Sequence, residues 1–500
     1  MFRNWEKCNV IKGCVMIKTL IHHILNCFIL FYCIIYSEAT AQSFNKDEFA
    51  QRRQQFMDKM EGGIAIFKSA KVSNRNYDVD YEYRQNSDFY YLTGFEEPES
   101  AILLIPDAEQ EFIMFVRQRN PAMEVWTGKR YGIEGAMNVF QADTAFTFKK
   151  FEEMLPAYLR GKGKVYYSMD DEGFNNKLLS MMKLRWGDPP KHLIDPLQFV
   201  HEMRLIKSSF EINLMKRSID ITGDSHIEAM KAAEPGMYEY EIEAIIEYIY
   251  RKNGCQRVGF PSIVGSGPNS TVLHYEANNR QTESGDLIVI DIGAEFEYYS
   301  ADITRTIPVN GRFSKEQKEI YEIVLEAQKV GINMMAPGVG LGEIEQKIAE
   351  TLKDGLYQLG LITDTDSKWQ YRIWYPHTAS HWLGLEVHDA GSYRGTDRKR
   401  GRILQRGMVA TVEPGIYIGE NSLDNIFERQ AWFIKDVKKE EIIRFVEKVR
   451  PVAEKYLNIG IRIEDDVLIT ENGHEVLSSK APKEIKEIEK LMKESSYFSK

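Results

Sequence analysis

Residues 286–308 read DLIVIDIGAEFEYYSADITRTIP and place two aspartates beside apolar runs. The run Leu287–Ile290 predicts a buried strand that ends at Asp291, and Gly293 follows it closely. Asp302 lies 11 residues after Asp291, so a hairpin between them would bring both carboxylates to one face. A carboxylate at the end of a buried strand is costly unless it is paired, protonated or bound to a metal. For either aspartate alone, the simpler interpretation that it caps a turn stays open.

Three further residues of metal-binding type follow in similar settings. His381 lies within PHTASHWLG, Glu413 follows the apolar run in ATVEPG, and Glu464 lies within GIRIEDD. With Asp291 and Asp302 they form a set of four carboxylates and one imidazole, which suits Mn²⁺ or another hard divalent ion better than a thiolate-preferring one. Four carboxylates would over-supply charge around one ion. We therefore expect two ions about 3.5–4 Å apart, with a bridging water deprotonated as the nucleophile.

The chain around these residues mixes helices with short strands. Capping boxes at Ser208–Glu211 and Ser314–Gln317 predict the starts of two helices, and another helix is expected over 238–253. This arrangement predicts an α+β fold with antiparallel strands. Near the end of the chain, alternation would place Arg462 and Glu464 on one face of a single strand. The expected strands are 286–291, 297–308, 408–412 and 461–470, and further helices are expected over 438–455 and 483–493.

The length of 500 residues favours two domains. Residues from about 47 to 195 combine helices with short apolar strands, and Asp195-Pro196 offers a boundary. We expect a smaller mixed α/β domain over 42–200 and a catalytic domain over 201–500. The N-terminal strands are expected at residues 64–67, 101–105 and 112–116.

The charge balance argues against nucleic acid as the main partner. The formal net charge is −10, whereas a phosphate-binding surface needs clustered excess cation. The densest basic run is Arg398–Arg400, with Arg402 close by, and it is predicted to be a solvated loop.

The N-terminus has the pattern of an export signal. Three lysines precede an apolar run of 13 residues, 24–36, which is shorter than the roughly 20 residues that a membrane-spanning helix needs. Small residues predict cleavage after Ala41, so 1–41 is expected to be a signal peptide. The mature protein would then be periplasmic or secreted, without stable membrane insertion. A start at Met16 and an uncleaved membrane anchor are the alternatives.

The five candidate ligands and their flanking sequences resemble the pita-bread metallopeptidases, which include methionine aminopeptidase, prolidase and aminopeptidase P. The strings DITRT, SHWLGL, VEPG and RIEDD are most similar to aminopeptidase P. So is YRQNSDF at residues 83–89, followed by TGF at 93–95. The ligand positions match in order, and the resemblance extends from about residue 47 to the end. It implies an aminopeptidase P-type N-terminal domain followed by a C-terminal pita-bread (creatinase/aminopeptidase-like) catalytic domain. The large N-terminal domain disfavours methionine aminopeptidase.

The resemblance also implies a role for each metal ligand. Asp291 would hold one ion, Asp302 and Glu464 would bridge two ions, and His381 and Glu413 would bind the other. Glu413 would also be catalytic, as the general base and acid that handles the proton of the bridging water.

Other site residues are implied in the same way. His388 is similar to a histidine that steadies the oxyanion of the tetrahedral intermediate, and His274 to one that contacts the substrate near the scissile bond. His377, Tyr417 and Arg462 are similar to members of the substrate-binding proline pocket and its supporting shell. Arg462 is also counted among the catalytic residues.

The implied activity is release of the first residue from peptides with proline at the second position. A prolidase restricted to X-Pro dipeptides is the alternative, because the metal ligands do not separate the two. A non-catalytic pita-bread binding module is the other alternative, which the complete ligand set disfavours.

One departure from the family is a longer segment between Glu413 and Glu464. The extra residues, about 421–457, are expected to form an outward insertion that could shade the cleft or build a subunit contact. The resemblance implies a homo-oligomer, either a dimer or a tetramer.

Overall fold

The computed structural model shows two compact units, which divide between Asp195 and Pro196. Helix α8 (Leu197–Leu205) spans the boundary expected between residues 200 and 201 and lies wholly in the second unit. The predicted signal peptide lies outside the part of the chain that the structure describes. Within that part, no helix combines the length and apolar character needed to cross a bilayer. The described residues are 45–183, 188–424, 426–429 and 431–498.

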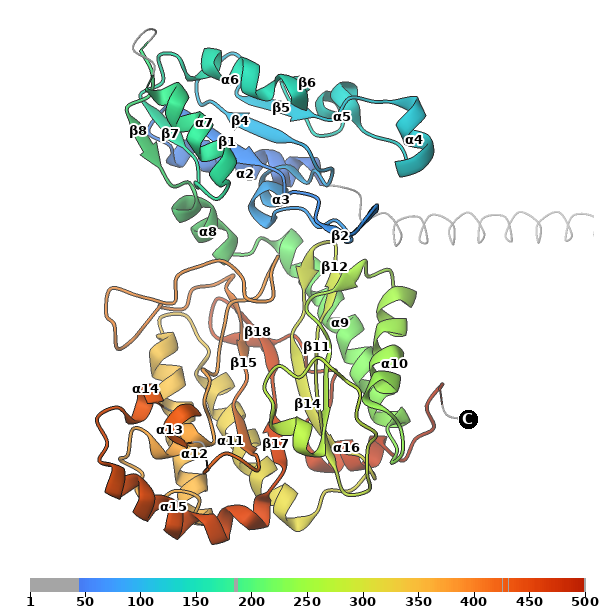
Figure 1. Cartoon of the computed structure of the whole chain (residues 1–500), viewed down its shortest axis with the longest axis vertical. Helices are drawn as coiled ribbons and strands as arrows, with labels where there is room; N and C mark the ends of the chain where they lie inside the picture. Colours follow the sequence, from blue (N-terminus) through green and yellow to red (C-terminus); the bar gives the residue numbers. More distant parts are fainter. Residues whose placement is uncertain (1–44, 184–187, 425, 430, 499–500) are drawn as a thin grey trace, which may run out of the picture. The chain divides into compact units, whose positions relative to one another are not determined.

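The first unit is a mixed six-stranded sheet in the order β6-β5-β4-β1-β7-β8, covered by helices (Figure 1). The pairs β1–β4 and β4–β5 are antiparallel, and β1–β7, β7–β8 and β5–β6 are parallel. The mixed α/β character predicted for this half is therefore confirmed. Its elements are α2 Lys46–Lys59, β1 Ile64–Lys68, β2 Asn74–Asn76, β3 Val79–Asp80, α3 Ser87–Thr93, β4 Ala101–Leu104, β5 Phe112–Val116, α4 Pro121–Thr127, α5 Gly132–Asn138, β6 Thr144–Thr147, α6 Phe151–Leu159, β7 Lys164–Tyr166, α7 Glu172–Met182 and β8 His192–Ile194.

The second unit is built around the predicted hairpin. Strands β11 (Leu287–Ile292) and β14 (Ile303–Pro308) are antiparallel, with Asp291 opposite Thr304. The ten residues between them contain a smaller hairpin, β12 (Ala294–Phe296) and β13 (Tyr299–Ser300), which joins a different sheet. The predicted strand 297–308 is therefore two strands, and Asp302 lies in the break between them.

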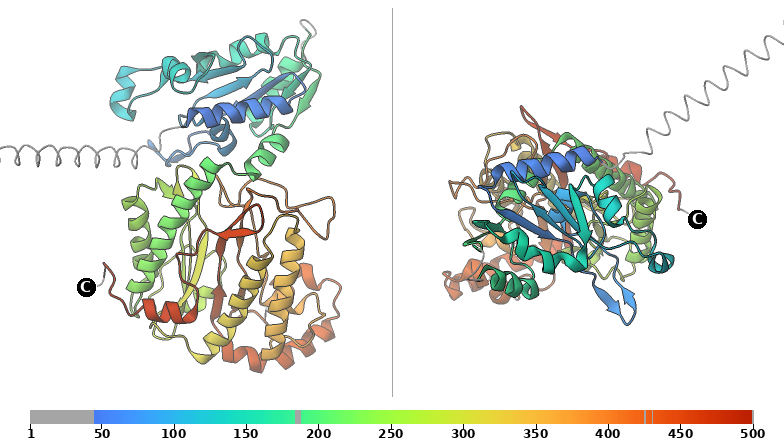
Figure 2. Two further views of the ribbon diagram at one scale, coloured as in Figure 1. Left: turned by 180° about the vertical axis from the view of Figure 1, so that it is seen from behind. Right: turned by 90° about the horizontal axis from the view of Figure 1, so that it is seen from above.

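Two helix pairs flank the strands of this unit, α9–α10 on one side and α11–α12 on the other (Figures 1 and 2). Both capping boxes are formed: Ser208 and Ser314 each accept a hydrogen bond from the backbone three residues on, and Glu211 and Gln317 bond back. The bounds are α9 Ser209–Ala232, α10 Glu239–Lys252, β9 Arg257–Val258, β10 Ile263–Ser266, α11 Lys315–Met334, α12 Leu341–Leu359, β15 Val409–Val412, β16 Gly415–Ile418, α13 Ile426–Arg429, α14 Ala431–Ile434, α15 Lys439–Ala453, β17 Ile459–Arg462, β18 Asp465–Ile469, β19 His474–Val476 and α16 Ile485–Leu491.

The prediction of a single strand over residues 461–470 is wrong. The run forms two strands, β17 and β18, which pair with β16 and β15 in different sheets. Glu464 lies between them, where its backbone N–H donates to the carbonyl oxygen of Thr304 at 3.0 Å. Arg462 and Glu464 still line the same cavity. They do so because the strand is interrupted between them, and not because side chains alternate along a single strand.

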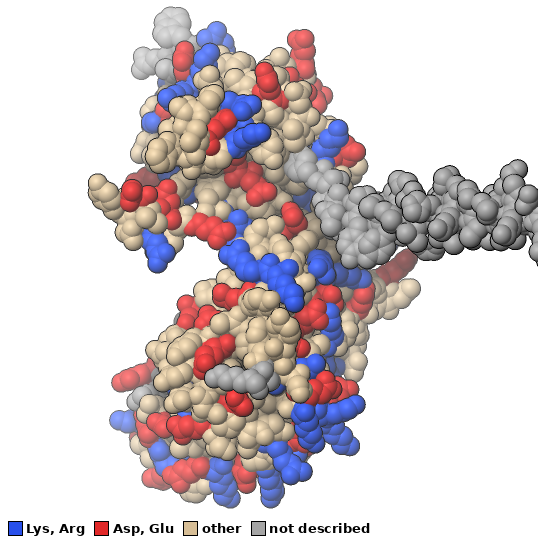
Figure 3. Space-filling model, turned by 90° about the vertical axis from the view of Figure 1, so that its right-hand side faces the viewer, with Lys and Arg blue, Asp and Glu red and all other residues tan. Residues whose placement is uncertain are grey.

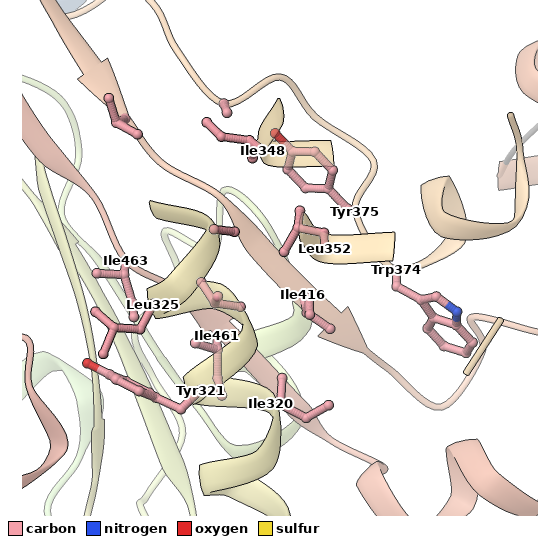
Figure 4. Close-up of a cluster of buried hydrophobic side chains, with 14 of the residues drawn as sticks. Ile320, Tyr321, Leu325, Ile348, Leu352, Trp374, Tyr375, Ile416, Ile461 and Ile463 are labelled. Carbon is pink, nitrogen blue, oxygen red and sulfur yellow. The ribbon is translucent and has the colours of Figure 1, made fainter. Parts of the chain in front are cut away.

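Apolar side chains from both halves of the second unit fill one core, part of which Figure 4 shows. The segment 421–457, expected to lie outside the core, contributes to it: Phe445 of α15 is buried against Trp369 with ring centroids 4.9 Å apart. The labelled core residues of Figure 4 are Ile320, Tyr321, Leu325, Ile348, Leu352, Trp374, Tyr375, Ile416, Ile461 and Ile463.

Helix α9 presents polar side chains to the backbone of the hairpin. Ser218 Oγ donates to the carbonyl oxygen of Ala294 at 2.6 Å. His226 is fully buried, with Nε2 2.9 Å from the carbonyl oxygen of Ile303, the residue after Asp302. Because a carbonyl only accepts, Nε2 carries the proton, and a second proton on the partnerless buried Nδ1 would have no acceptor. Burial, with the nearby charge of Arg305, lowers the pKa of His226 to about 3.

We expect His226→Gln to make the protein less sensitive to acid. The unfolded chain protonates histidine near pH 6.5, whereas folded His226 resists protonation down to about pH 3. Stability is therefore lost as pH falls through this window, by up to about 1.4 kcal/mol per pH unit. The glutamine amide would keep a donor for the carbonyl oxygen of Ile303 but would not titrate. Urea unfolding between about pH 6 and pH 4 should give a shallower loss, while exposed His192→Gln keeps the wild-type slope. Equal slopes for wild type and His226→Gln would contradict this account.

Candidate metal centre

The five predicted ligands line one cavity of about 890 Å³ in the second unit. Each lies at or just beyond the end of a strand or in a loop between strands. Asp291 lies on β11, and Asp302 immediately precedes β14. Glu413 follows β15, Glu464 lies between β17 and β18, and His381 lies on the long connection from α12 to β15. The structure thus brings together residues that span more than 170 positions of sequence.

His381 is at the centre of the group. Its Nε2 is 3.3 Å from Asp302 Oδ2, 3.5 Å from Glu413 Oε1 and 3.7 Å from Glu464 Oε1. Ligand atoms of Asp302, His381 and Glu464 all lie within 4.8 Å of one another, a spacing that one metal ion can span. The three residues are buried.

The donor set fits a divalent cation. Asp291 Oδ1, Asp302 Oδ1 and Glu464 Oε1 are buried and accept no hydrogen bond, an arrangement that is costly unless a cation compensates it. Burial and the charges of Glu464 and Asp291 raise the pKa of Asp302 well above its ordinary value. Burial and Glu464 do the same to the pKa of Glu413. Nearby positive charge, which metal ions would supply, would favour the ionised form of these carboxylates.

A directed chain of hydrogen bonds runs beside the carboxylates. Arg462 donates to Tyr417 Oη at 2.9 Å, and Tyr417 Oη lies 2.9 Å from His377 Nε2. His377 Nδ1 lies 2.8 Å from the carbonyl oxygen of Thr378. Because that carbonyl only accepts, Nδ1 carries the proton and Nε2 accepts from the tyrosine hydroxyl. Burial lowers the pKa of His377 to about 3 and raises that of Tyr417 to about 12, so both side chains are neutral at pH 7.

The same arginine joins this chain to the candidate ligands. Arg462 forms a 2.5 Å ion pair with Asp291 Oδ2 and donates through Nε to Thr304 Oγ1 at 3.2 Å. Thr304 Oγ1 donates to Glu464 Oε2 at 2.7 Å. One oxygen of each carboxylate is thus held by the protein, and the other is left without a hydrogen bond.

The remaining predicted residues also lie at the cavity. His274 and His388 line it, and the ring of His388 is 4.3 Å from that of His381. Burial and His381 lower the pKa of His388. His377 and Arg462 line the cavity as well. Tyr417 does not line it but is hydrogen-bonded to both of these residues.

Among the cavity residues that the sequence patterns do not indicate are the charged side chains of Glu345 and Arg398. Glu345 of α12 lines the cavity and accepts from the backbone N–H of Ala379 at 2.8 Å. Arg398, in the basic run predicted to be a solvated loop, is exposed but also lines the cavity. Arg402, by contrast, makes a bidentate pair with Glu202. On the face shown in Figure 3, acidic and basic side chains are interspersed.

Two family models match the chain in the expected order. The model of the aminopeptidase P N-terminal domain matches residues 49–166, and that of metallopeptidase family M24 matches residues 213–471. The second match contains all five candidate ligands.

Named relatives match over nearly the whole chain. It is 38% identical to the Xaa-Pro aminopeptidase of Escherichia coli, over 90% of this chain and 98% of that one. It is 31% identical to human Xaa-Pro aminopeptidase 3, over 90% of this chain and 86% of that one.

Solved structures agree with these relatives. An aminopeptidase of Pseudomonas aeruginosa superimposes with a TM-score of 0.81 at 39% identity, over 90% of this chain and 98% of that one. Proline aminopeptidase P II of Yersinia pestis gives a TM-score of 0.81 at 36% identity, over 90% and 100%. The predicted pita-bread fold with an aminopeptidase P-type N-terminal domain is thereby confirmed. The chain belongs to metallopeptidase family M24, among the members that carry the aminopeptidase P N-terminal domain.

Proposed function

We propose that this protein is an Xaa-Pro aminopeptidase, which releases the first residue of peptides whose second residue is proline. The observation that carries the proposal is the cavity itself. Four carboxylates and an imidazole converge on one side of it, and the hydrogen-bonded chain Arg462–Tyr417–His377 borders them. High-coverage relatives with the same activity in their names support it.

Two divalent ions, most suitably Mn²⁺, would be held by Asp291, Asp302, His381, Glu413 and Glu464. When bound, they would activate a water molecule for attack on the X-Pro carbonyl carbon. The resemblance makes Asp302 and Glu464 the residues that would bridge the ions, and each is buried with a carboxylate oxygen free of hydrogen bonds, as Asp291 is.

Proton transfer is assigned to Glu413. Its raised pKa suits a group that takes a proton from the nucleophile and returns it to the leaving proline nitrogen. His388, beside His381, would donate a hydrogen bond to the developing oxyanion. His274, which also lines the cavity, would contact the substrate near the scissile bond.

Proline recognition is assigned to the side of the cavity that His377 lines. The nitrogen of an X-Pro bond carries no N–H, so an enzyme cannot hold this peptide bond by accepting a hydrogen bond from it. His377, with Tyr417 and Arg462 behind it, offers a fixed aromatic wall without requiring that donor. Export after cleavage at Ala41 and assembly into a dimer or tetramer remain proposals that follow from the sequence.

The test is cleavage by the purified protein, stripped of metal and then supplied with Mn²⁺. An X-Pro-Y tripeptide, an X-Pro dipeptide and an X-Ala-Y tripeptide are compared. We expect metal-dependent release of X from X-Pro-Y and little cleavage of X-Ala-Y. Cleavage of the dipeptide alone would assign a prolidase instead. Failure on every substrate with metal bound would overturn the proposal and favour a binding module.

A further inference from the structure

A buried carboxylate outside the metal centre organises one wall of the cavity. Glu239 is the first residue of α10 and is fully buried. It lies at a helix N-terminus, where the backbone dipole favours negative charge. Among the described residues no ion pair involves Glu239, so its direct contacts are hydrogen bonds, and the guanidinium of Arg280 attracts it from farther away.

Five donors surround this carboxylate. Glu239 Oε1 accepts from the backbone N–H and the hydroxyl of Ser266, both at 2.7 Å, and from Asn269 Nδ2 at 3.1 Å. Oε2 accepts from the hydroxyl of Tyr275 at 2.8 Å and from the backbone N–H of Arg280 at 2.9 Å. These donors all lie in a single segment, residues 266–280.

That segment forms part of the cavity wall. Leu273, His274 and Glu276 line the cavity and flank Tyr275 on both sides. After a short 3-10 helix that ends at Thr271, the segment has no regular structure until Arg280. Without a helix or strand ladder to define its path, the bonds to Glu239 hold the loop at four positions, Ser266, Asn269, Tyr275 and Arg280.

We propose that Glu239 is a positioning residue, which holds the loop 266–280 so that His274 is presented to the substrate. The inference rests on the proposed function for the role of His274, although the anchoring itself does not. Only an ionised carboxylate offers acceptors to donors on both of its oxygens. In Glu239→Gln an NH₂ donor replaces one carboxylate oxygen. That NH₂ would face either the donors of Ser266 and Asn269 or those of Tyr275 and Arg280, and so could not accept their hydrogen bonds. The change therefore releases one end of the loop with almost no change in volume.

The first test is a double-mutant cycle in the full-length, metal-loaded protein. Glu239→Gln should lower kcat/KM for X-Pro-Y by about 10- to 100-fold, because a displacement of about 1 Å is enough for such a loss. Added to His274→Ala, it should cause little further loss, since the loop then has no histidine to misplace. Losses that multiply in the double variant would overturn the proposal.

The second test does not need activity. Hydrogen–deuterium exchange of residues 266–280 should increase in Glu239→Gln while bound metal stays at the wild-type level. Glu241→Gln is the matched control, because Glu241 caps the same helix by accepting from the backbone N–H of Tyr238 at 2.7 Å, a bond that glutamine can keep. It should leave both exchange and kcat/KM unchanged.

A milder variant covers the case in which Glu239→Gln does not fold. Tyr275→Phe removes one donor to Glu239 and should raise exchange in the same loop. Unchanged exchange in the variants that fold would overturn the anchoring. A wild-type protein inactive on every proline peptide, with exchange behaving as expected, would overturn the proposed function and the role of His274 but leave the anchoring intact.

Discussion

Asp302→Asn is expected to lower kcat/KM for an X-Pro-Y tripeptide by about 1,000-fold or more, equivalent to about 4 kcal/mol of transition-state stabilisation. Asp302 Oδ2 lies 3.3 Å from His381 Nε2, and Oδ1 is buried without a hydrogen bond. Asparagine would offer one neutral oxygen and an NH₂ group that repels a cation. The protein should therefore bind less metal as well as lose activity.

The Tm of the Asp302→Asn variant, measured without and with metal, distinguishes a metal ligand from a residue that only stabilises the fold. Burial and the neighbouring carboxylates raise the pKa of Asp302, so its ionised form opposes folding when no cation is bound. Asp302→Asn should leave the Tm of the metal-stripped protein unchanged or higher, and should shrink the rise in Tm that added Mn²⁺ produces.

Metal analysis, thermal unfolding and tripeptide kinetics on the same samples test this. Asp354→Asn is the control, because it makes the same chemical change at an exposed position of α12. Wild-type activity in Asp302→Asn with a full complement of metal would remove Asp302 from the site.

Those features of the fold that depend on neighbouring residues could be predicted from the sequence. The capping boxes at Ser208 and Ser314 form as expected, because their bonds close within three residues. The pairing of Asp291 with the strand after Asp302 also follows from a local pattern, two apolar runs joined by a short connection. The positions of Glu413 and Glu464 at the cavity came from resemblance, since no local pattern joins residues so far apart.

Contacts between distant segments account for what the sequence did not predict. Glu464 falls in a break between strands because its backbone bonds to Thr304, a residue of β14 in another sheet. Glu345 and Arg398 reach the cavity from a helix and a loop whose sequences resemble an ordinary solvated surface. The sequence places Glu239 in the first turn of a helix, and only the folded path of 266–280 reveals its five donors.

A buried ionic cluster next to the candidate ligand Glu464 was likewise not predicted from the sequence. Arg305 is completely buried and pairs with Asp465 Oδ1 at 2.7 Å. It also donates to the carbonyl oxygens of Glu464, at 2.5 Å, and Ala481, at 2.8 Å. Burial alone would raise the pKa of Asp465, but the charges of Arg305 and Lys483 outweigh it and hold that pKa well below its usual range. One guanidinium thus fixes the backbone that carries a proposed bridging ligand.

We expect Arg305→Met to lower the free energy of unfolding by about 3–5 kcal/mol, because it takes one of two cationic partners from a buried carboxylate and removes the guanidinium donor to several carbonyl groups. Adding Asp465→Asn should recover part of this loss, since the buried carboxylate that has kept only Lys483 as a cationic partner is then gone. Lys216→Met is the control: its pair with Glu475 is exposed, so its removal should cost about 1 kcal/mol or less. Chemical denaturation measures all three variants. If Arg305→Met costs no more than Lys216→Met, the buried pair does not stabilise the fold beneath Glu464. A loss that Asp465→Asn fails to relieve would instead place the cost in the broken carbonyl bonds.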